Sequence, residues 1–220
     1  MKSIIRLEHL GKRFGQKVIF RDLSLDLPSG QLIGITGESG TGKSTLLNLV
    51  SGIEAADSGK VNSCGFSLDK ISPRQKTQFY RSSIAFLFQN FGLVEYETVR
   101  DNLEMALHYK RMTAKQKEQA MQHALQSVGL PGFLDRKVFE LSGGEQQRVA
   151  LARVALKPSV LILCDEPTGS LDEYNKNIVM QILLSFQKSG KSILLVTHDR
   201  SLLPLCQLRY HIQDQSLIQY

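Results

Sequence analysis

The segment that decides the fold of this 220-residue chain is Gly37-Glu38-Ser39-Gly40-Thr41-Gly42-Lys43-Ser44-Thr45. It fits the phosphate-loop pattern G-x-x-x-x-G-K-[ST], with an apolar strand predicted at 31–35 and a helix at 45–50. The glycines let backbone N–H groups turn toward phosphate oxygens, and the helix N-terminus adds partial positive charge. Lys43 is placed to bridge the β- and γ-phosphates, and Ser44 to offer its hydroxyl to Mg²⁺. The alternative is a glycine-rich turn that matches by chance, and the flanking strand and helix argue against it.

An acidic pair follows a second apolar strand. The apolar run over residues 160–164 is followed directly by Asp165 and Glu166. Ligands of parallel α/β sheets bind at the carboxyl ends of the strands. Asp165 is therefore suited to hold Mg²⁺ through a bridging water molecule. Glu166 is suited to act as the general base that polarises the attacking water. The structural alternative is that this pair only caps the next helix.

The segment Leu141-Ser142-Gly143-Gly144-Glu145 indicates a second anion site. Ser142 and Glu145 form a capping box, which by itself explains a helix start. It leaves Gly143 and Gly144 unexplained, because glycine in a first turn destabilises a helix but lets a ligand approach the exposed N–H groups. Two phosphate sites in one chain predict a two-fold homodimer, in which each phosphate loop faces the serine–glycine turn of the other chain.

The remaining chain alternates strand and helix patterns. Apolar runs at 84–88, 160–164 and 193–196 predict strands, and helices are expected at 75–82, 120–128, 145–156 and 175–187. Strand–helix–strand order with continuous apolar strands predicts a parallel sheet covered on both faces. The sequence therefore predicts an α/β chain with a strand-rich N-terminal part and a helical insert.

Composition narrows the class of protein. The chain is 42% apolar and 22% charged, which excludes disorder and fibrous repeats. Its longest apolar runs are too short for a membrane helix, and charge returns too soon at the N-terminus for a signal peptide. Three cysteines without a C-x-x-C pair predict a reduced, cytosolic chain without disulfides or zinc.

The net charge of +6 is spread along the chain: +3 in residues 1–30, +2 in 31–90, zero in 91–140 and +1 in 141–220. A solvated, mildly basic surface explains this distribution. Attraction to anionic lipid or nucleic acid is the alternative.

The motifs together resemble those of ATP-binding-cassette ATPases. Leu141-Ser142-Gly143-Gly144-Glu145-Gln146-Gln147 resembles the family's signature, and the order also matches: phosphate loop, Gln89, signature, Asp165-Glu166, Ser170-Leu171-Asp172 and His198. The resemblance covers nearly the whole chain. It implies a single domain over 1–220: a P-loop NTPase core with a mostly parallel sheet, an N-terminal antiparallel β subdomain and a helical subdomain at about 91–157.

The resemblance also implies roles for individual residues. Gln89 would contact Mg²⁺ and the attacking water, His198 would contact the γ-phosphate, and Asp172 would lie in a loop that communicates across the dimer. Phe14 stands where the family has an aromatic that stacks on adenine, and a phenylalanine keeps the π-face; a core phenylalanine is the alternative. Ser142, Gly143, Gly144 and Gln146 would complete the site of the partner chain. ATP and Mg²⁺ are the implied cofactors.

The same resemblance predicts the biological role. Residues 88–94, with 165–172, are similar to the subfamily that drives lipoprotein release, macrolide and antimicrobial-peptide export, and cell-division signalling. The expected protein is a homodimeric ATPase subunit on the cytoplasmic face of the membrane, bound to a permease on a separate chain. Phe91 and Leu93 are expected in the core, or alternatively in a groove for that partner. The alternative function is a soluble cassette ATPase acting on nucleic acid or ribosomes, although no nucleic-acid partner is expected.

Overall fold

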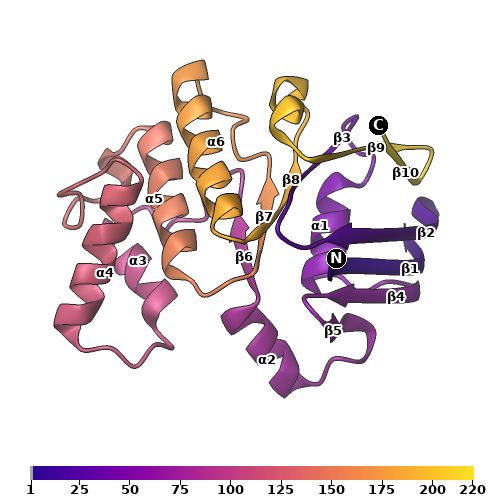
Figure 1. Ribbon diagram of the computed structural model, residues 1–220, viewed down its shortest axis with the longest axis horizontal. Helices are drawn as coiled ribbons and strands as arrows, with labels where there is room; N and C mark the ends of the chain where they lie inside the picture. The colour runs from indigo at the N-terminus through magenta and orange to yellow at the C-terminus, as the bar shows by residue number, and fades with distance from the viewer. Residues whose placement is uncertain (1) are drawn as a thin grey trace.

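The computed structural model describes residues 2–220, and two β-sheets form its frame (Figure 1). The larger sheet has the strand order β10-β9-β3-β8-β7-β6. Its strands are β3 (Leu32–Gly37), β6 (Ile84–Leu87), β7 (Leu161–Asp165), β8 (Ser192–Val196), β9 (Leu208–Gln213) and β10 (Ser216–Gln219). All neighbours are parallel except β9 and β10, which form an antiparallel hairpin at one edge.

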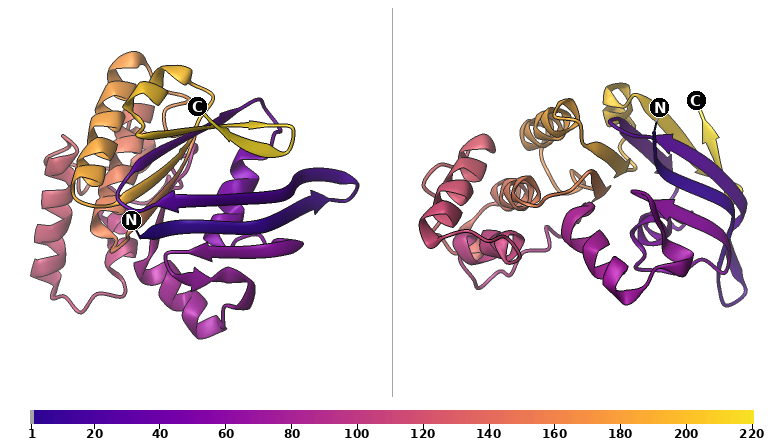
Figure 2. Two further views of the ribbon diagram at one scale, coloured as in Figure 1. Left: turned by 45° about the vertical axis from the view of Figure 1, so that its right-hand side comes forward. Right: turned by 60° about the horizontal axis from the view of Figure 1, so that its bottom comes forward.

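The smaller sheet is antiparallel and has the order β2-β1-β4-β5. It consists of β1 (Ser3–Phe14), β2 (Lys17–Pro28), β4 (Ser58–Ser63) and β5 (Phe66–Ser67). β1 and β2 form a long hairpin that lies beside β4 (Figure 2).

Helices cover the larger sheet. They are α1 (Lys43–Ser51), α2 (Pro73–Ser82), α3 (Val99–Leu107), α4 (Ala114–Ser127), α5 (Gly143–Leu156) and α6 (Glu173–Lys188). Helices α3, α4 and α5 pack on one another, on the side of the molecule away from the small sheet (Figure 2). No helix within residues 2–220 is both long and apolar enough to span a lipid bilayer.

The alternation of side chains along the central strands divides the core in two. On β7, Leu161 and Leu163 belong to a cluster with α1 and the small sheet. Ile162 and Cys164 belong to the opposite cluster, with α3 to α6. Because successive strand residues point to opposite faces, an apolar strand needs cover on both sides. The predicted parallel sheet, covered on both faces, is confirmed.

The register of the parallel strands brings their ends to one edge. Ile35 of β3 and Asp165 of β7 both lie opposite Val196 of β8, and Leu87 of β6 lies opposite Cys164. The segments that follow these four strands therefore leave the sheet at the same edge. They contain the phosphate loop, Gln89, Glu166 and His198.

Element ends differ from the predicted ones by a few residues. The helix expected from Glu145 begins at Gly143, because Ser142 caps it and both glycines adopt the helical turn. The helix expected from Thr45 begins at Lys43, directly after the left-handed Gly42. Phe91 and Leu93 are partly buried and pack against the core, as expected.

Candidate nucleotide site

The phosphate loop connects β3 to α1 and is shaped by its glycines. Gly42 has φ +107°, and a Cβ there would lie 2.4 Å from Cγ2 of Ile19. Only glycine tolerates both the left-handed backbone and this close approach. The ammonium of Lys43 donates to the carbonyls of Gly37 at 2.8 Å and Glu38 at 2.9 Å, so it lies inside the curve of the loop.

The other loop residues surround this lysine. The Thr41 hydroxyl donates to the Glu38 carbonyl at 2.9 Å, and Gly40 has φ +76°. Ser39 and Ser44 are exposed, and Thr45 is half-buried at the start of α1.

Asp165 ends β7 beside the loop. Burial raises the pKa of its carboxyl above the ordinary range, and a hydrogen bond from the Ser44 hydroxyl partly opposes this shift. The nearby charges also act: Glu166 raises the pKa and Lys43 lowers it. A hydroxyl and a carboxylate are hard oxygen ligands of the kind that Mg²⁺ takes. The donor set at Ser44 and Asp165 thus fits this ion.

Glu166 and His198 form a pair at the same edge. Oε2 of Glu166 lies 2.9 Å from Nδ1 of His198 and accepts the His198 backbone N–H at 3.2 Å. The Glu166 side chain is 13% exposed and that of His198 is 66% exposed. Glu166 also has φ +48°, an unfavourable conformation for a residue with a side chain, and such strain concentrates at functional sites. The carboxylate is thereby aimed across the sheet edge toward His198.

Gln89 lies two residues after the end of β6, and its side chain approaches the loop that follows Glu166. A Cβ built on Gly169 would lie 3.8 Å from the Gln89 amide nitrogen. The loop after Glu166 therefore passes within van der Waals reach of the Gln89 amide.

Phe14 lies at the end of β1, and its ring is 47% exposed. Phe14 is therefore not a core residue, which was the alternative interpretation of this position. The ammonium of Lys12 lies 4.8 Å from the ring centroid. Phe14 pairs with Lys17 of β2, whose ammonium donates to the Gly40 carbonyl of the phosphate loop at 3.3 Å. An exposed aromatic face at this position is a surface on which a nucleotide base can stack.

The signature turn, residues 142–144 at the start of α5, lies apart from the residues described so far. Ser142 caps α5 with a complete capping box, and Ser142 and Gly143 are exposed. Helix α5 lies on the opposite side of the larger sheet from α1, so one chain does not bring this turn to its own phosphate loop (Figure 1). Gln146 is held internally, since its amide donates to the Leu141 carbonyl at 3.0 Å.

Gly144 has a structural reason that the sequence did not reveal. It is buried, and a Cβ there would lie 2.4 Å from Cγ of Asn175 on α6. Asn175 also accepts from Arg148 at 3.1 Å and donates to the Asp172 carboxylate at 3.0 Å. Asp172 is the N-cap of α6, and the hydrogen bonds from Asn175 lower the pKa of its carboxyl. Asn175 thus joins α5 to α6, and no spacing or motif in the sequence pointed to it.

The fold and this edge of the sheet define a P-loop nucleoside triphosphatase. Family comparison narrows the class: residues 20–169 match the model described as "ABC transporter". The chain is 34% identical over 218 residues to the lipoprotein-releasing system ATP-binding protein LolD of Aquifex aeolicus, covering 99% of this chain and 97% of that protein. It is 33% identical over 220 residues to the macrolide export ATP-binding/permease protein MacB of Neisseria gonorrhoeae, covering 98% of this chain. The chain spans about a third (34%) of the length of that relative.

Solved structures agree with these relatives. The dimeric post-hydrolysis structure of the ATP-binding cassette MJ0796 bound to ADP and Pi superposes with a TM-score of 0.89. It shares 28% sequence identity, with 98% of this chain and 97% of that one covered. The chain therefore belongs to the ABC transporter family and is an ATP-binding ATPase cassette. Neither the family model nor these relatives support the alternative function on nucleic acid.

Proposed function

We propose that this cassette hydrolyses ATP with Glu166 as general base and His198 and Gln89 positioning the γ-phosphate and the attacking water. The observation that carries the proposal is the convergence of the phosphate loop, Asp165–Glu166 and His198 at one edge of the sheet. Backbone N–H groups of the loop and Lys43 would bind the phosphates. Ser44, Asp165 and Gln89 would hold Mg²⁺, which supplies charge neutralisation at the phosphate oxygens.

The signature turn and Asp172 would act on the nucleotide of a second copy. Ser142 and Gly143 are exposed at a helix N-terminus, where backbone N–H groups and the helix dipole favour an anion. They begin α5, which packs on the opposite face of the larger sheet from α1, the helix that follows the phosphate loop. A two-fold dimer that pairs each loop with the partner's turn would make two complete sites.

The variant Glu166→Gln tests the hydrolytic role. It removes the base but keeps the side-chain volume, so we expect ATP turnover to fall at least about a hundredfold. ATP affinity should stay within about twofold, and the ATP-bound dimer should persist in size-exclusion chromatography. The matched control is Glu95→Gln, whose carboxylate is exposed on a loop outside the site. Unchanged turnover in Glu166→Gln would show that another group activates the water.

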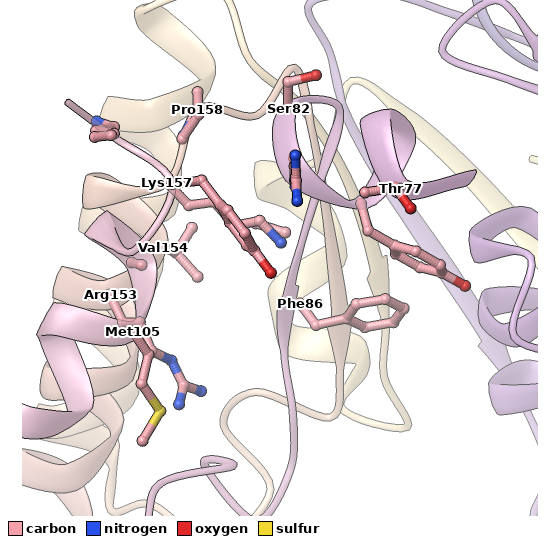
Figure 3. Close-up of a pocket in the computed structure, with 14 residues that line it drawn as sticks. Thr77, Ser82, Phe86, Met105, Arg153, Val154, Lys157 and Pro158 are labelled. Carbon is pink, nitrogen blue, oxygen red and sulfur yellow. The ribbon is translucent and has the colours of Figure 1, made fainter. Parts of the chain in front are cut away.

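A groove on the same subunit fits a membrane partner on a separate chain. It has a volume of about 670 Å³ and lies between α2 and β6 on one wall and α3 and α5 on the other (Figure 3). Its lining contains none of the phosphate-loop residues. Its walls are largely apolar and include Phe86, Met105 and Val154.

The charged groups of the groove are all basic: Arg81, Lys110, Arg153 and Lys157. None of the four has an ion pair within residues 2–220. Burial lowers the pKa of Lys157, and the charge of Arg153 lowers it further. A permease segment with apolar side chains and at least one carboxylate would relieve this excess positive charge. Such binding would hold the cassette on the cytoplasmic face of the membrane, as in an exporter or a mechanical-transmission system.

Charge reversal in the groove tests this part of the proposal. Lys110→Glu with Lys157→Glu should move the protein from the membrane pellet to the soluble fraction of host cells, because the docking segment would be repelled. Basal ATP turnover of the purified variant should stay within about twofold. Lys115→Glu, an exposed lysine on α4 outside the groove, is the control. Equal membrane fractions for all three proteins would rule out docking in this groove.

A further inference from the structure

Lys12 is a buried lysine next to an exposed aromatic ring. Its side chain is 8% exposed, whereas Phe14, two residues further along β1, is 47% exposed. A lysine is almost never buried unless its ammonium is paired. The partners of this ammonium therefore indicate why the chain keeps a charge at this position.

Three oxygen groups hold the Lys12 ammonium. It donates to the Ala55 carbonyl at 2.8 Å, and it lies 3.2 Å from the Glu54 carboxylate and 3.7 Å from that of Asp57. On its remaining side it lies 4.8 Å from the centroid of the Phe14 ring, within the range of a cation–π interaction. One face of the ring is thus occupied by a fixed cation, and its exposed area lies away from it.

The three partners belong to the segment that follows the phosphate-loop helix. This segment, residues 53–57, begins just after the C-cap of α1, the helix whose first residues are Lys43 and Ser44. Asp57 fastens it to β1 on both sides of Lys12: its carboxylate accepts the Arg13 N–H at 2.7 Å, and its own N–H donates to the Gly11 carbonyl at 2.9 Å. The strand that carries the ring is therefore tied to the far end of the helix that starts at the phosphate loop.

We infer that Lys12 is a positioning residue for the nucleotide base: it fixes the Phe14 ring so that one face stays open to adenine at a set distance from the phosphate loop. The ammonium also draws electron density away from the open face. This lowers the repulsion between that face and the π-system of a stacked purine. The inference rests on the proposed stacking role of Phe14 and goes beyond it by naming the group that holds the platform.

The test separates base binding from phosphate binding. Dissociation constants for ATP and for inorganic tripolyphosphate, which has no base, are measured by calorimetry on the full chain. Lys12→Met keeps an unbranched side chain of similar length without the charge. It should weaken ATP binding about three- to tenfold, the range of a cation–π contact combined with lost stacking order. Tripolyphosphate binding should stay within about twofold, and in turnover assays KM should rise while kcat is maintained.

Three further variants identify the cause. Lys12→Arg keeps the cation and should restore ATP affinity to within about twofold of the original chain. Phe14→Ala should weaken ATP binding, and adding Lys12→Met to it should have no further effect, because the two residues act through one platform. Lys60→Met, a lysine of β4 that is paired with Glu8 at 3.5 Å, is the matched control and should change neither ligand.

Each contrary outcome has a distinct meaning. If Lys12→Met weakens ATP and tripolyphosphate equally, or costs the same affinity in the Phe14→Ala background, Lys12 acts on the fold and not on the base, and the inference is wrong. If Phe14→Ala binds ATP normally, the stacking role itself fails and the inference falls with it. Glu54→Gln covers the case in which Lys12→Met does not fold. It loosens the same ammonium and should give a smaller loss for ATP alone, and an equal loss for both ligands would again overturn the inference.

Discussion

Three glycines of this cassette are required, or tolerated, for different structural reasons. Gly42 combines a left-handed backbone with the close approach of Ile19 and Phe20, so it is fixed by conformation and by space. Gly144 has an ordinary helical backbone and is fixed only by the packing of Asn175. Gly143, its neighbour, has no close atom other than the Phe91 ring at 3.8 Å and remains open to a ligand. The same residue type thus shapes a loop, joins two helices and exposes N–H groups.

A comparison of the variants Gly42→Ala and Gly190→Ala separates the cost of backbone strain from the cost of steric crowding. Both positions have positive φ, +107° and +94°, but a Cβ at Gly190 would meet nothing within 4 Å. We expect Gly190→Ala to lower the free energy of unfolding by about 1 kcal/mol through backbone strain alone. Gly42→Ala should lower it by about 3 kcal/mol, because overpacking adds to the strain. Urea unfolding measures both, and equal losses would mean that the loop relaxes away from Ile19.

At the scale of elements, ion pairs hold the loop that carries His198. Lys176 on α6 lies 2.9 Å from the Asp199 carboxylate, directly after His198. The Ser201 hydroxyl and then Lys176 hydrogen-bond this carboxylate, which lowers its pKa from 3.8 to about 2. Helix α6 is thus connected to the edge of the sheet at which Glu166 and His198 meet.

This pair predicts a pH dependence of stability. Because the folded pKa is depressed, the stabilisation is fully present above pH about 4 and is lost as the pH falls through about 2. Asp199→Asn should therefore lower the free energy of unfolding at pH 7 by about 1 kcal/mol, after allowance for solvent screening. The difference from the original chain should shrink as the pH falls from 4 through 2 in denaturant titrations. A difference that is the same at every pH would assign the effect to packing, and Glu95→Gln provides the control.

At the scale of the whole molecule, the phosphate loop and the signature turn (residues 142–144) lead into two different helices, α1 and α5. Helices α1 and α5 pack on different faces, in separate core clusters. Ser142 could reach the phosphate loop of its own chain only if α5 left its face of the sheet, which would break the core cluster to which it belongs. A shared site in a dimer is therefore the arrangement that uses both anion sites.

Ser142→Arg tests that arrangement. The bulky cation would block a partner's nucleotide at the turn, so turnover should fall at least about tenfold while ATP binding to the monomer stays within about twofold. Thr113→Arg is the matched control, because it removes an N-cap with the same capping box on α4, away from both anion sites. Each loses about 1 kcal/mol of capping stabilisation. Equal turnover in the two variants would mean that the turn is not part of the site.

Local patterns were sufficient to predict much of this cassette. The phosphate loop, the strands and the Asp165–Glu166 pair are set by residues within a few positions of one another, so spacing and apolar alternation predict them. The meeting of these strands at one edge follows from a parallel sheet, in which carboxyl ends align. The roles of Gln89, His198, Asp172 and Phe14 rested on family resemblance, because a single glutamine or histidine carries no local signal.

Contacts between distant segments had no counterpart in the sequence pattern. The Lys12 ammonium meets an oxygen 43 residues away, and Arg148 meets Asn175 across 27 residues. The basic groove likewise forms only when α2, α3 and α5 come together. Lysines and asparagines occur on most surfaces, so their type does not say which ones the fold buries or pairs. Packing of elements against one another decides that, and here it placed the buried ammonium of Lys12 beside the exposed ring of Phe14.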